Sequence, residues 1–216
     1  MARQTTLFDD PENSDGGVEV LPGDGSAVLY TGVLDAAAAD HALATLTTTL
    51  AWRQQPVRVF GRTVAQPRLT AWYGEPGASY TYSGLRLEPL PWTPLLDTLR
   101  RLCEDLAGET FNSVLANLYR DGNDTVSWHA DDEPELGAEP TIASLSLGAT
   151  RRFHLRHRET RETVHVDLPA GSVLVMSGLS QRYWLHQVPR SRRVHEPRIN
   201  LTFRRIGTAT APGGKT

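Results

Sequence analysis

The chain contains 216 residues, 39% of them hydrophobic, and carries a formal net charge of −3 at pH 7. This length fits one domain, and since no apolar run approaches the length of a membrane span, we expect no membrane-spanning helix. The single Cys103 excludes an internal disulfide or a cysteine zinc site, and it is typical of a reducing compartment. Residues 1–17 are polar and acidic and hold no signal segment, so we expect a cytoplasmic protein.

Charge is unevenly distributed along the chain. Residues 150–205 hold 12 arginines against 4 Asp and Glu residues, so this segment is strongly basic while the remainder is acidic. Such asymmetry often marks a basic face for an acidic partner such as a nucleic acid. A solvated surface would explain it equally well, and charge alone does not decide between the two.

We expect disordered tails at residues 1–17 and 207–216. Two helices are expected before residue 110. The first begins near Asp35 and runs through "AAAADHALATLTTTL". The second has Thr93 as N-cap and Pro94 in its first turn, carries a stripe of leucines at helical spacing, and ends at Gly108.

Nearly all of the remaining chain consists of short strand patterns between Gly, Pro and Asp turns. Many short strands behind two early helices predict a mainly β fold with flanking helices (α+β), in which a sandwich or barrel is buttressed by the helices. The expected strands lie within residues 56–61, 68–74, 79–84, 113–119, 143–148, 151–157, 164–168, 172–177 and 198–205.

Three residues form a candidate metal site. His129 and Asp131 are two apart in "VSWHADDE", so on an extended backbone both side chains face the same way. His186 follows the apolar run "GSVLVMSG". Two imidazoles and one carboxylate are the facial triad of non-haem Fe(II) oxygenases, which leaves open positions on the metal. The other five histidines are expected to be structural or solvated: His41, His154, His157, His165 and His195.

The strand "RINLTFR" suggests a cosubstrate for that metal. Its apolar residues share one face, and its polar residues share the other: Arg198, Asn200, Thr202 and Arg204. Buried arginines need anionic partners. A 2-oxo dicarboxylate would bind iron through its keto acid end and offer its far carboxylate to an arginine, so we expect 2-oxoglutarate here. Asn117 and Tyr119, again two apart, could add neutral donors.

These residues together resemble the AlkB family of Fe(II)/2-oxoglutarate dioxygenases over roughly residues 55–206. The resemblance rests on an ordered set of motifs: "NLYRDG", "HADDE", "ASLSLGA", His186 and "PRINLTFR". It implies a double-stranded β-helix of jelly-roll type, with the metal at one open end. It also implies that the residues named above bind Fe(II) and 2-oxoglutarate, and that O2 is the second cosubstrate. One domain would then span residues 18–206, with an N-terminal extension and nucleotide-recognition hairpins at 18–110 and a catalytic core at 111–206.

Within the family the sequence looks most like the homologues that repair alkylated duplex DNA. The resemblance implies that Val59-Phe60-Gly61 is a finger that wedges into the base stack, and that Arg68 contacts DNA. The implied pocket for the extracted base consists of Tyr80, Tyr82, Asp132 and Glu133. Two departures are Ala130, where the family often has arginine, and Tyr82, where that branch often has phenylalanine.

The reaction implied is oxidative demethylation of N-alkylated bases such as 1-methyladenine and 3-methylcytosine, with release of formaldehyde, succinate and CO2. These lesions are cationic and cannot pair normally, and both properties favour their extraction. We expect a monomer. Two alternatives stay open at the level of sequence: the same chemistry on RNA or a protein side chain, and a cupin-like module that binds a metal or ligand without turnover.

Overall fold

The computed structural model describes residues 16–59, 62–78, 80–82 and 85–207. The two expected tails lie almost wholly outside these residues, as do Phe60 and Gly61 of the expected wedge. None of the helices in the described part of the chain is long and apolar enough to cross a membrane.

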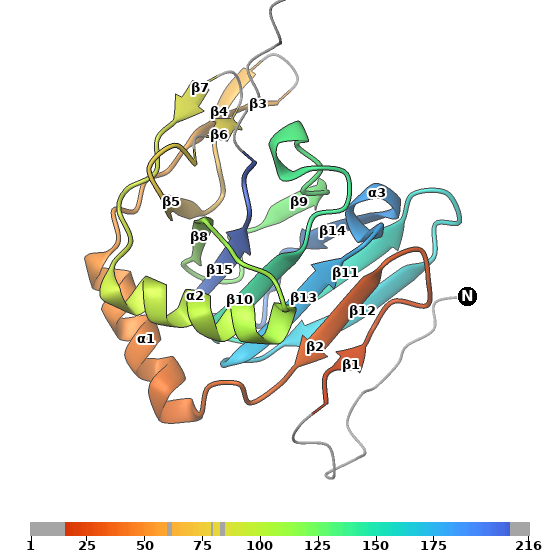
Figure 1. Cartoon of the computed structure of the whole chain (residues 1–216). Helices are drawn as coiled ribbons and strands as arrows, with labels where there is room; N and C mark the ends of the chain where they lie inside the picture. Colours follow the sequence, from red (N-terminus) through yellow and green to blue (C-terminus); the bar gives the residue numbers. More distant parts are fainter. Residues whose placement is uncertain (1–15, 60–61, 79, 83–84, 208–216) are drawn as a thin grey trace, which may run out of the picture.

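Two antiparallel sheets form the body of the protein (Figure 1). The large sheet has the order β1 (Val18–Glu19), β2 (Ser26–Tyr30), β13 (Ser172–Ser177), β10 (Ile142–Gly148), β15 (Arg198–Arg204), β8 (Ser113–Tyr119) and β5 (Leu69–Gly74). The small sheet has the order β12 (Thr163–Leu168), β11 (Arg151–His157), β14 (Trp184–Val188) and β9 (Val126–His129). The sheets face each other as in a jelly roll, which confirms the expected fold class.

Two hairpins lie above β5 in Figure 1. One pairs β3 (Pro56–Val59) with β4 (Arg62–Ala65), and the other pairs β6 (Tyr80–Tyr82) with β7 (Leu85–Leu87). They are the segments that the sequence resemblance assigned to nucleotide recognition. The expected wedge residue Val59 ends β3, and the expected pocket residues Tyr80 and Tyr82 lie on β6, but the side chains of all three are outside the described part of the protein.

Two helices cover one face of the large sheet (Figure 1). α1 (Ala36–Thr49) begins after Asp35, whose side chain accepts a hydrogen bond from the backbone of Ala38. α2 (Pro94–Ala107) has Thr93 as N-cap and Gly108 in the left-handed conformation as C-cap. Both helices, the start of α1 near Asp35 and both ends of α2 were predicted, and the structure confirms them.

The central strand β15 separates two environments. On its helix side Ile199, Leu201 and Phe203 are buried in one hydrophobic core with residues of α1 and α2. A second core fills the space between the two sheets, where Leu174 of β13 packs with Leu155 of β11. The polar residues of β15 face this second space, so the strand holds its charged side chains inside the jelly roll.

Several elements were not predicted. β2 and β14 are interior strands of five residues, and each pairs with a strand far away in the sequence: β2 with β13, and β14 with β9. Such non-local pairing stabilises strands that local propensity alone does not indicate. His186 was placed after a strand by the sequence pattern, whereas the structure places it in the middle of β14. A short helix, α3 (Ser180–Tyr183), precedes this strand, and the 3-10 turn Pro134–Leu136 follows β9.

α3 is seated against the turn between β1 and β2. Gly25 in this turn has φ +124°, and a Cβ added there would lie 2.3 Å from the backbone nitrogen of Ser180. Next to it, the indole nitrogen of Trp184 donates a 3.1 Å hydrogen bond to the carbonyl of Gly23. The close approach therefore requires glycine at position 25, and it fixes α3 and the start of β14.

We predict that Gly25→Ala destabilises the protein more than Gly32→Ala. Both glycines have positive φ, at which alanine costs about 1–2 kcal/mol. Only at Gly25 would the added Cβ clash with backbone atoms, since a Cβ at Gly32 would meet nothing within 4 Å. Overpacking should add roughly 1–3 kcal/mol at Gly25. Urea unfolding followed by tryptophan fluorescence measures both, and equal losses would contradict the close contact.

Candidate metal and 2-oxoglutarate centre

The three expected metal ligands meet at one end of the small sheet. His129 and His186 are direct cross-strand partners on β9 and β14, and their ring centroids are 4.2 Å apart. Asp131 lies two residues beyond His129. One ligand atom from each of the three residues lies within 4.8 Å of the other two. In the described part of the chain this is the one such group of His, Cys, Asp and Glu residues.

The protonation states suit a divalent metal. Nδ1 of His129 is 2.8 Å from the carbonyl of Ser127, which can only accept, so this nitrogen carries the proton and Nε2 is left to bind a metal. Burial lowers the pKa of His186 to about 3, which keeps its imidazole neutral at pH 7. Burial would raise the pKa of Asp131, but Arg204 and the two imidazoles outweigh it and lower that pKa to about 2.

Arg204 holds the carboxylate of Asp131. Its guanidinium lies 2.8 Å from Oδ2 of Asp131, and both side chains are buried. The other carboxylate oxygen, Oδ1, is 3.9 Å from Nε2 of His129. The sequence analysis assigned Arg204 to 2-oxoglutarate; the structure places it against the metal ligand, so that one carboxylate oxygen faces Arg204 and the other faces the imidazole.

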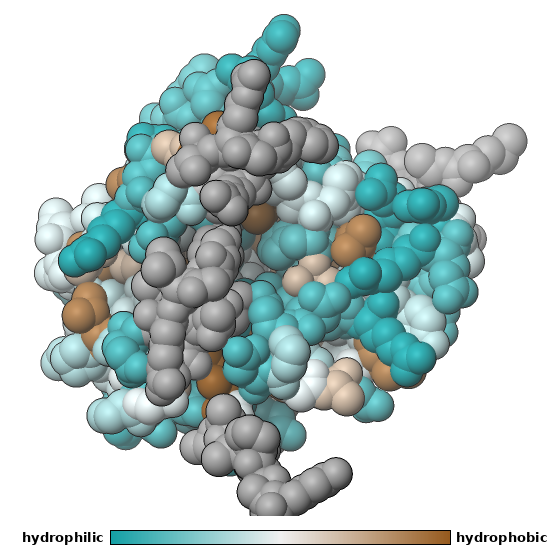
Figure 2. Space-filling model, turned by 90° about the horizontal axis from the view of Figure 1, so that it is seen from above, coloured by the Kyte–Doolittle hydropathy of each residue, from teal (hydrophilic) through white to brown (hydrophobic). Residues whose placement is uncertain are grey.

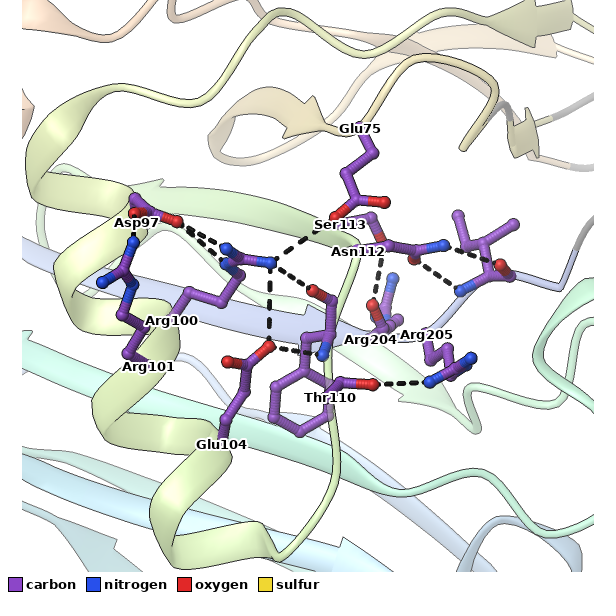
Figure 3. Close-up of polar contacts among 12 residues, drawn as sticks. Glu75, Asp97, Arg100, Arg101, Glu104, Thr110, Asn112, Ser113, Arg204 and Arg205 are labelled. Atoms are coloured by element: carbon purple, nitrogen blue, oxygen red, sulfur yellow. Dashed lines mark hydrogen bonds and ion pairs between the residues drawn. The ribbon is translucent and has the colours of Figure 1, made fainter.

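The end of β15 is fixed from the side of α2, as Figure 3 shows. The Ser113 hydroxyl donates a 3.0 Å hydrogen bond to the carbonyl of Arg204, and the Asn112 side chain makes two 2.8 Å bonds to the backbone of Ile206. Two residues of α2 hold the backbone of Phe111, which precedes Asn112. Arg100 donates a 3.0 Å hydrogen bond to the Phe111 carbonyl, and Glu104 accepts a 2.7 Å hydrogen bond from the Phe111 N–H. A rigid helix thus sets the position of the arginine that orients Asp131.

Arg198 is buried and incompletely satisfied. Its Nη2 donates to Oγ of Ser146 at 2.9 Å, but Nε and Nη1 are buried and have no hydrogen-bond partner among the described residues. The guanidinium lies 5.2 Å from the ring centroid of Tyr119, and that of Arg151 lies 5.5 Å from the same centroid. Burial lowers the pKa of Arg198 to about 10, so it is still charged at pH 7. Two cations around one phenol ring form an environment that favours an anion.

The remaining expected 2-oxoglutarate residues lie on the same inner face. Asn200 donates to Oγ of Ser144 at 2.7 Å and accepts from Thr202 at 3.1 Å. Asn117 pairs with Asn200 across β8 and β15, and its side-chain oxygen accepts a 2.8 Å bond from Arg68. The structure therefore brings all six expected residues to one face and places Arg68, expected at the DNA, beside Asn117.

A cavity of about 680 Å³ opens beside the three ligands. It is lined by His129 and Asp131, by Arg68 from one wall, and by Glu133 from the segment after β9. Asp132 is not among its lining residues: this side chain is exposed and lies 2.8 Å from Arg158. Of the two adjacent acidic residues expected in the base pocket, the structure brings only Glu133 to the cavity.

The histidines expected to be structural or solvated stay outside the triad. His154 and His165 stack with ring centroids 4.0 Å apart on the small sheet, while His157 is buried 3.3 Å from Asp24. His41 and His195 are exposed. None of them lies within a potential ligand cluster in the described residues.

The basic segment 150–205 is only partly a surface feature. Arg151, Arg198 and Arg204 are buried, and Arg152 and Arg158 lie within 3 Å of Asp167 and Asp132 respectively. Part of the excess of arginines in this segment is therefore buried and does not form a basic surface. The surface seen from above in Figure 2 is mainly hydrophilic, with small, separate hydrophobic spots.

Sequence reasoning missed Ser144, Ser146 and Arg151. The two serines alternate in "ASLSLG" on the strand beside β15, so the period-2 pattern could have assigned them to its polar face. Arg151 donates to the carbonyls of Asp121, Asp124 and Pro189. These partners are distant in sequence, and no local signal would have indicated burial.

Comparison with known proteins agrees with this geometry. The model of the 2OG-Fe(II) oxygenase superfamily matches residues 26–204. The chain belongs to this superfamily. The name of the superfamily gives Fe(II) as its metal and 2-oxoglutarate as its cosubstrate.

The relatives identify a branch of the superfamily. The alpha-ketoglutarate-dependent dioxygenase alkB homolog 3 of Homo sapiens is 46% identical over 188 residues, which cover 82% of this chain and 65% of that protein. The DNA oxidative demethylase ALKBH2 of Mus musculus is 46% identical over 159 residues, which cover 69% of this chain and 66% of that protein. The resemblance to the AlkB family is thereby confirmed. The chain spans just under two thirds of the length of the alkB homolog 3 relatives.

A solved structure supports the fold. The structure of OsALKBH1 has a TM-score of 0.60 and 19% sequence identity, and the match covers 83% of this chain and 97% of that one. At this identity the likeness concerns the fold alone, and it agrees with the jelly roll described above.

The residues present fit the cofactors of the superfamily. Two neutral imidazoles and an ionised carboxylate are a suitable donor set for Fe(II). The two buried nitrogens of Arg198 that lack partners among the described residues suit the far carboxylate of 2-oxoglutarate.

We predict that Asp131→Ala abolishes metal binding and also lowers stability. Removing one partner of a buried ion pair costs about 3–5 kcal/mol, because Arg204 loses its carboxylate. Asp132→Ala is the matched control: its exposed pair with Arg158 should contribute less than about 1 kcal/mol, and metal binding should survive. Co(II) titration and urea unfolding measure the two effects. Metal binding by Asp131→Ala at wild-type affinity would remove this residue from the ligand set.

We predict that Arg198→Ala weakens 2-oxoglutarate binding by about 2–3 kcal/mol, because a charge-assisted contact is lost. Metal binding should persist, since no ligand is touched. Arg205→Ala, which removes an exposed arginine directly after β15, should change neither metal binding nor 2-oxoglutarate binding. Calorimetric titration of the Co(II) form measures the dissociation constant, and an unchanged value in Arg198→Ala would mean that this guanidinium serves another anion.

Proposed function

We propose that this protein is an Fe(II)- and 2-oxoglutarate-dependent dioxygenase that removes N-alkyl groups from damaged bases in DNA. When bound, Fe(II), 2-oxoglutarate and O2 supply the oxidation of the N-methyl carbon. One oxygen atom enters the methyl group and the other enters succinate as CO2 leaves. The resulting hemiaminal then breaks its C–N bond, which releases formaldehyde and restores the base.

The observation that carries this proposal is the buried Arg198 guanidinium, with two nitrogens lacking described partners, in the same polar interior as the His129–Asp131–His186 group. A metal that uses three protein ligands keeps positions for a chelating cosubstrate, whereas a purely structural site would fill them. The non-catalytic alternative is disfavoured on this ground. We assign His129, Asp131 and His186 to Fe(II). To 2-oxoglutarate we assign Asn117, Tyr119, Arg198, Asn200 and Thr202.

In this proposal Arg204 is a positioning residue as well as a neighbour of the cosubstrate. Its contact with Oδ2 of Asp131 leaves Oδ1 directed toward His129. Because the ion pair is buried, the carboxylate keeps one orientation as substrates exchange. Reactions of this kind depend on placement of the reacting carbon, so a fixed ligand set directly supports turnover.

The cavity offers a base aromatic surface from Trp72 and Trp128. Its charged lining is mixed, with three acidic residues (Glu88, Asp131 and Glu133) and three arginines (Arg53, Arg68 and Arg204), of which Arg204 pairs with Asp131. A base methylated at its pairing edge is cationic and unpaired, so it can stack on an aromatic ring as a cation and is extracted at lower cost than a normal base. The names of the relatives, which include DNA oxidative demethylase, support DNA as the substrate class.

The function is tested by product formation. The protein with Fe(II), 2-oxoglutarate and O2 should release succinate and formaldehyde together when given an oligonucleotide carrying 1-methyladenine or 3-methylcytosine. The unmethylated oligonucleotide should give no formaldehyde. Matched DNA and RNA oligonucleotides separate the two nucleic acids, and succinate without formaldehyde from any of them would refute demethylation.

We predict that Phe60→Ala selectively lowers repair in duplex DNA if Val59-Phe60-Gly61 wedges into the base stack. The ring would fill the gap left by an extracted base, a gap that matters in a duplex and not in a single strand. The ratio of duplex to single-strand rates measures this. If Phe60 were a core residue instead, its removal would cost about 3–5 kcal/mol and lower both rates in parallel. Melting temperature is the control, and a parallel fall would refute the wedge.

A further inference from the structure

We propose that Gln181 is a positioning residue of the metal centre, which holds the backbone of Asp131 and ties it to the strand that carries His186. The proposal rests on the assignment of His129, Asp131 and His186 to the metal. It adds a residue that touches neither metal nor substrate and that acts through Asp131.

Gln181 contacts the metal segment through one buried hydrogen bond. The backbone N–H of Asp131 donates to Oε1 of Gln181 at 2.9 Å, and both residues are buried. The amide nitrogen of Gln181 faces the other way, 3.3 Å from Oγ of Ser180 and 3.6 Å from the sulfur of Met176. The backbone donor requires an acceptor, so these contacts fix which end of the amide points at Asp131.

The segment around Asp131 needs such an anchor because it is not part of a strand. β9 ends at His129, and a 3-10 turn begins only at Pro134. Residues 130–133, between β9 and this turn, form no strand pairing that would fix their backbone. Arg204 fixes the side chain of Asp131 at 2.8 Å, and Gln181 fixes its main chain. With both ends held, the carboxylate has one position relative to the imidazoles.

The anchor itself is rigid. Gln181 lies in α3, whose backbone packs against Gly25 of the β1–β2 turn. Trp184, three residues later and buried, is tied by its indole nitrogen to the carbonyl of Gly23. A side chain that projects from this turn therefore has little freedom to follow a displacement of Asp131, so it sets the position of the ligand.

The position of Gln181 in the chain gives it a second effect. It lies five residues before His186, and the two are connected by the last turn of α3 and the start of β14. The 2.9 Å bond thus joins the segment carrying the first two ligands to the segment carrying the third. The pairing of His129 with His186 joins the same two segments from the other side. The hydrogen bond and the strand pairing together connect the two ligand-bearing segments at two points beside the proposed metal position.

The test compares three variants of the full chain by Co(II) titration and visible absorption of the Co(II) complex. Gln181→Met keeps the volume and removes the acceptor. Gln181→Glu keeps an acceptor oxygen for the Asp131 N–H. Gln187→Met makes the same change on β14, where Nε2 of Gln187 lies 3.3 Å from Nδ1 of His154. Outer contacts of this kind change metal affinity by about 10–100-fold.

We expect Gln181→Met to bind Co(II) at least about tenfold more weakly, with an altered absorption spectrum, in a protein that still folds. Gln181→Glu should recover most of the affinity, and Gln187→Met should resemble the wild type. If Gln181→Met binds as the wild type does, or if the Met and Glu variants are equally weakened, the proposal is overturned. A wild type that binds no Co(II) would instead refute the metal assignment.

Gln181→Met could fail to fold, and Gln181→Asn then takes its place. The asparagine keeps the polarity of the side chain and is one methylene too short to reach the Asp131 N–H. Weaker Co(II) binding by a folded Gln181→Asn supports the proposal, and wild-type affinity overturns it.

Discussion

The buried ion pair between Arg204 and Asp131 is the interaction on which the centre depends. It joins β15, an interior strand of the large sheet, to the segment that follows β9 at the edge of the small one. A buried charge is costly unless it is paired, so each partner requires the other. The ion pair thus fixes the position of the two sheets relative to each other at the point where the ligands meet. This arrangement explains why a strand in the middle of the fold can carry polar residues along one face without losing stability.

The interior contains more positive charge than the described residues neutralise. Of the buried Arg151, Arg198 and Arg204, Arg204 pairs with the buried Asp131, and Arg151 lies near the buried Asp124, which itself pairs with Arg120. Arg151 is satisfied by backbone carbonyls, while Arg198 has nitrogens without described partners. A dicarboxylate bound at Arg198, as proposed above, would supply negative charge there. The cosubstrate is therefore expected to stabilise the folded state as well as to serve the reaction, because any ligand that binds only the folded form does so.

Sequence reasoning located most of the centre because its residues follow short, regular periods. The alternation in "RINLTFR" gave the two faces of β15, and the spacing of His129 and Asp131 gave two ligands on one side of an extended segment. What it could not give were contacts between distant segments. That Arg204 would face Asp131, that Asp132 would turn to Arg158, and that Arg68 would meet Asn117 depend on how separate strands pack. The same limit applies to Gln181, whose partner lies 50 residues away.

The order of strands in the small sheet has a consequence for folding. His129 and His186 are neighbours only because β9 pairs with β14, although the two strands are separated in sequence by two other strands of the same sheet and by two of the large one. Closing such a long loop costs more conformational entropy than closing the local hairpin of β11 and β12, so this non-local pairing is expected to slow folding. The two imidazoles are brought together only in chains that have made the pairing of β9 with β14.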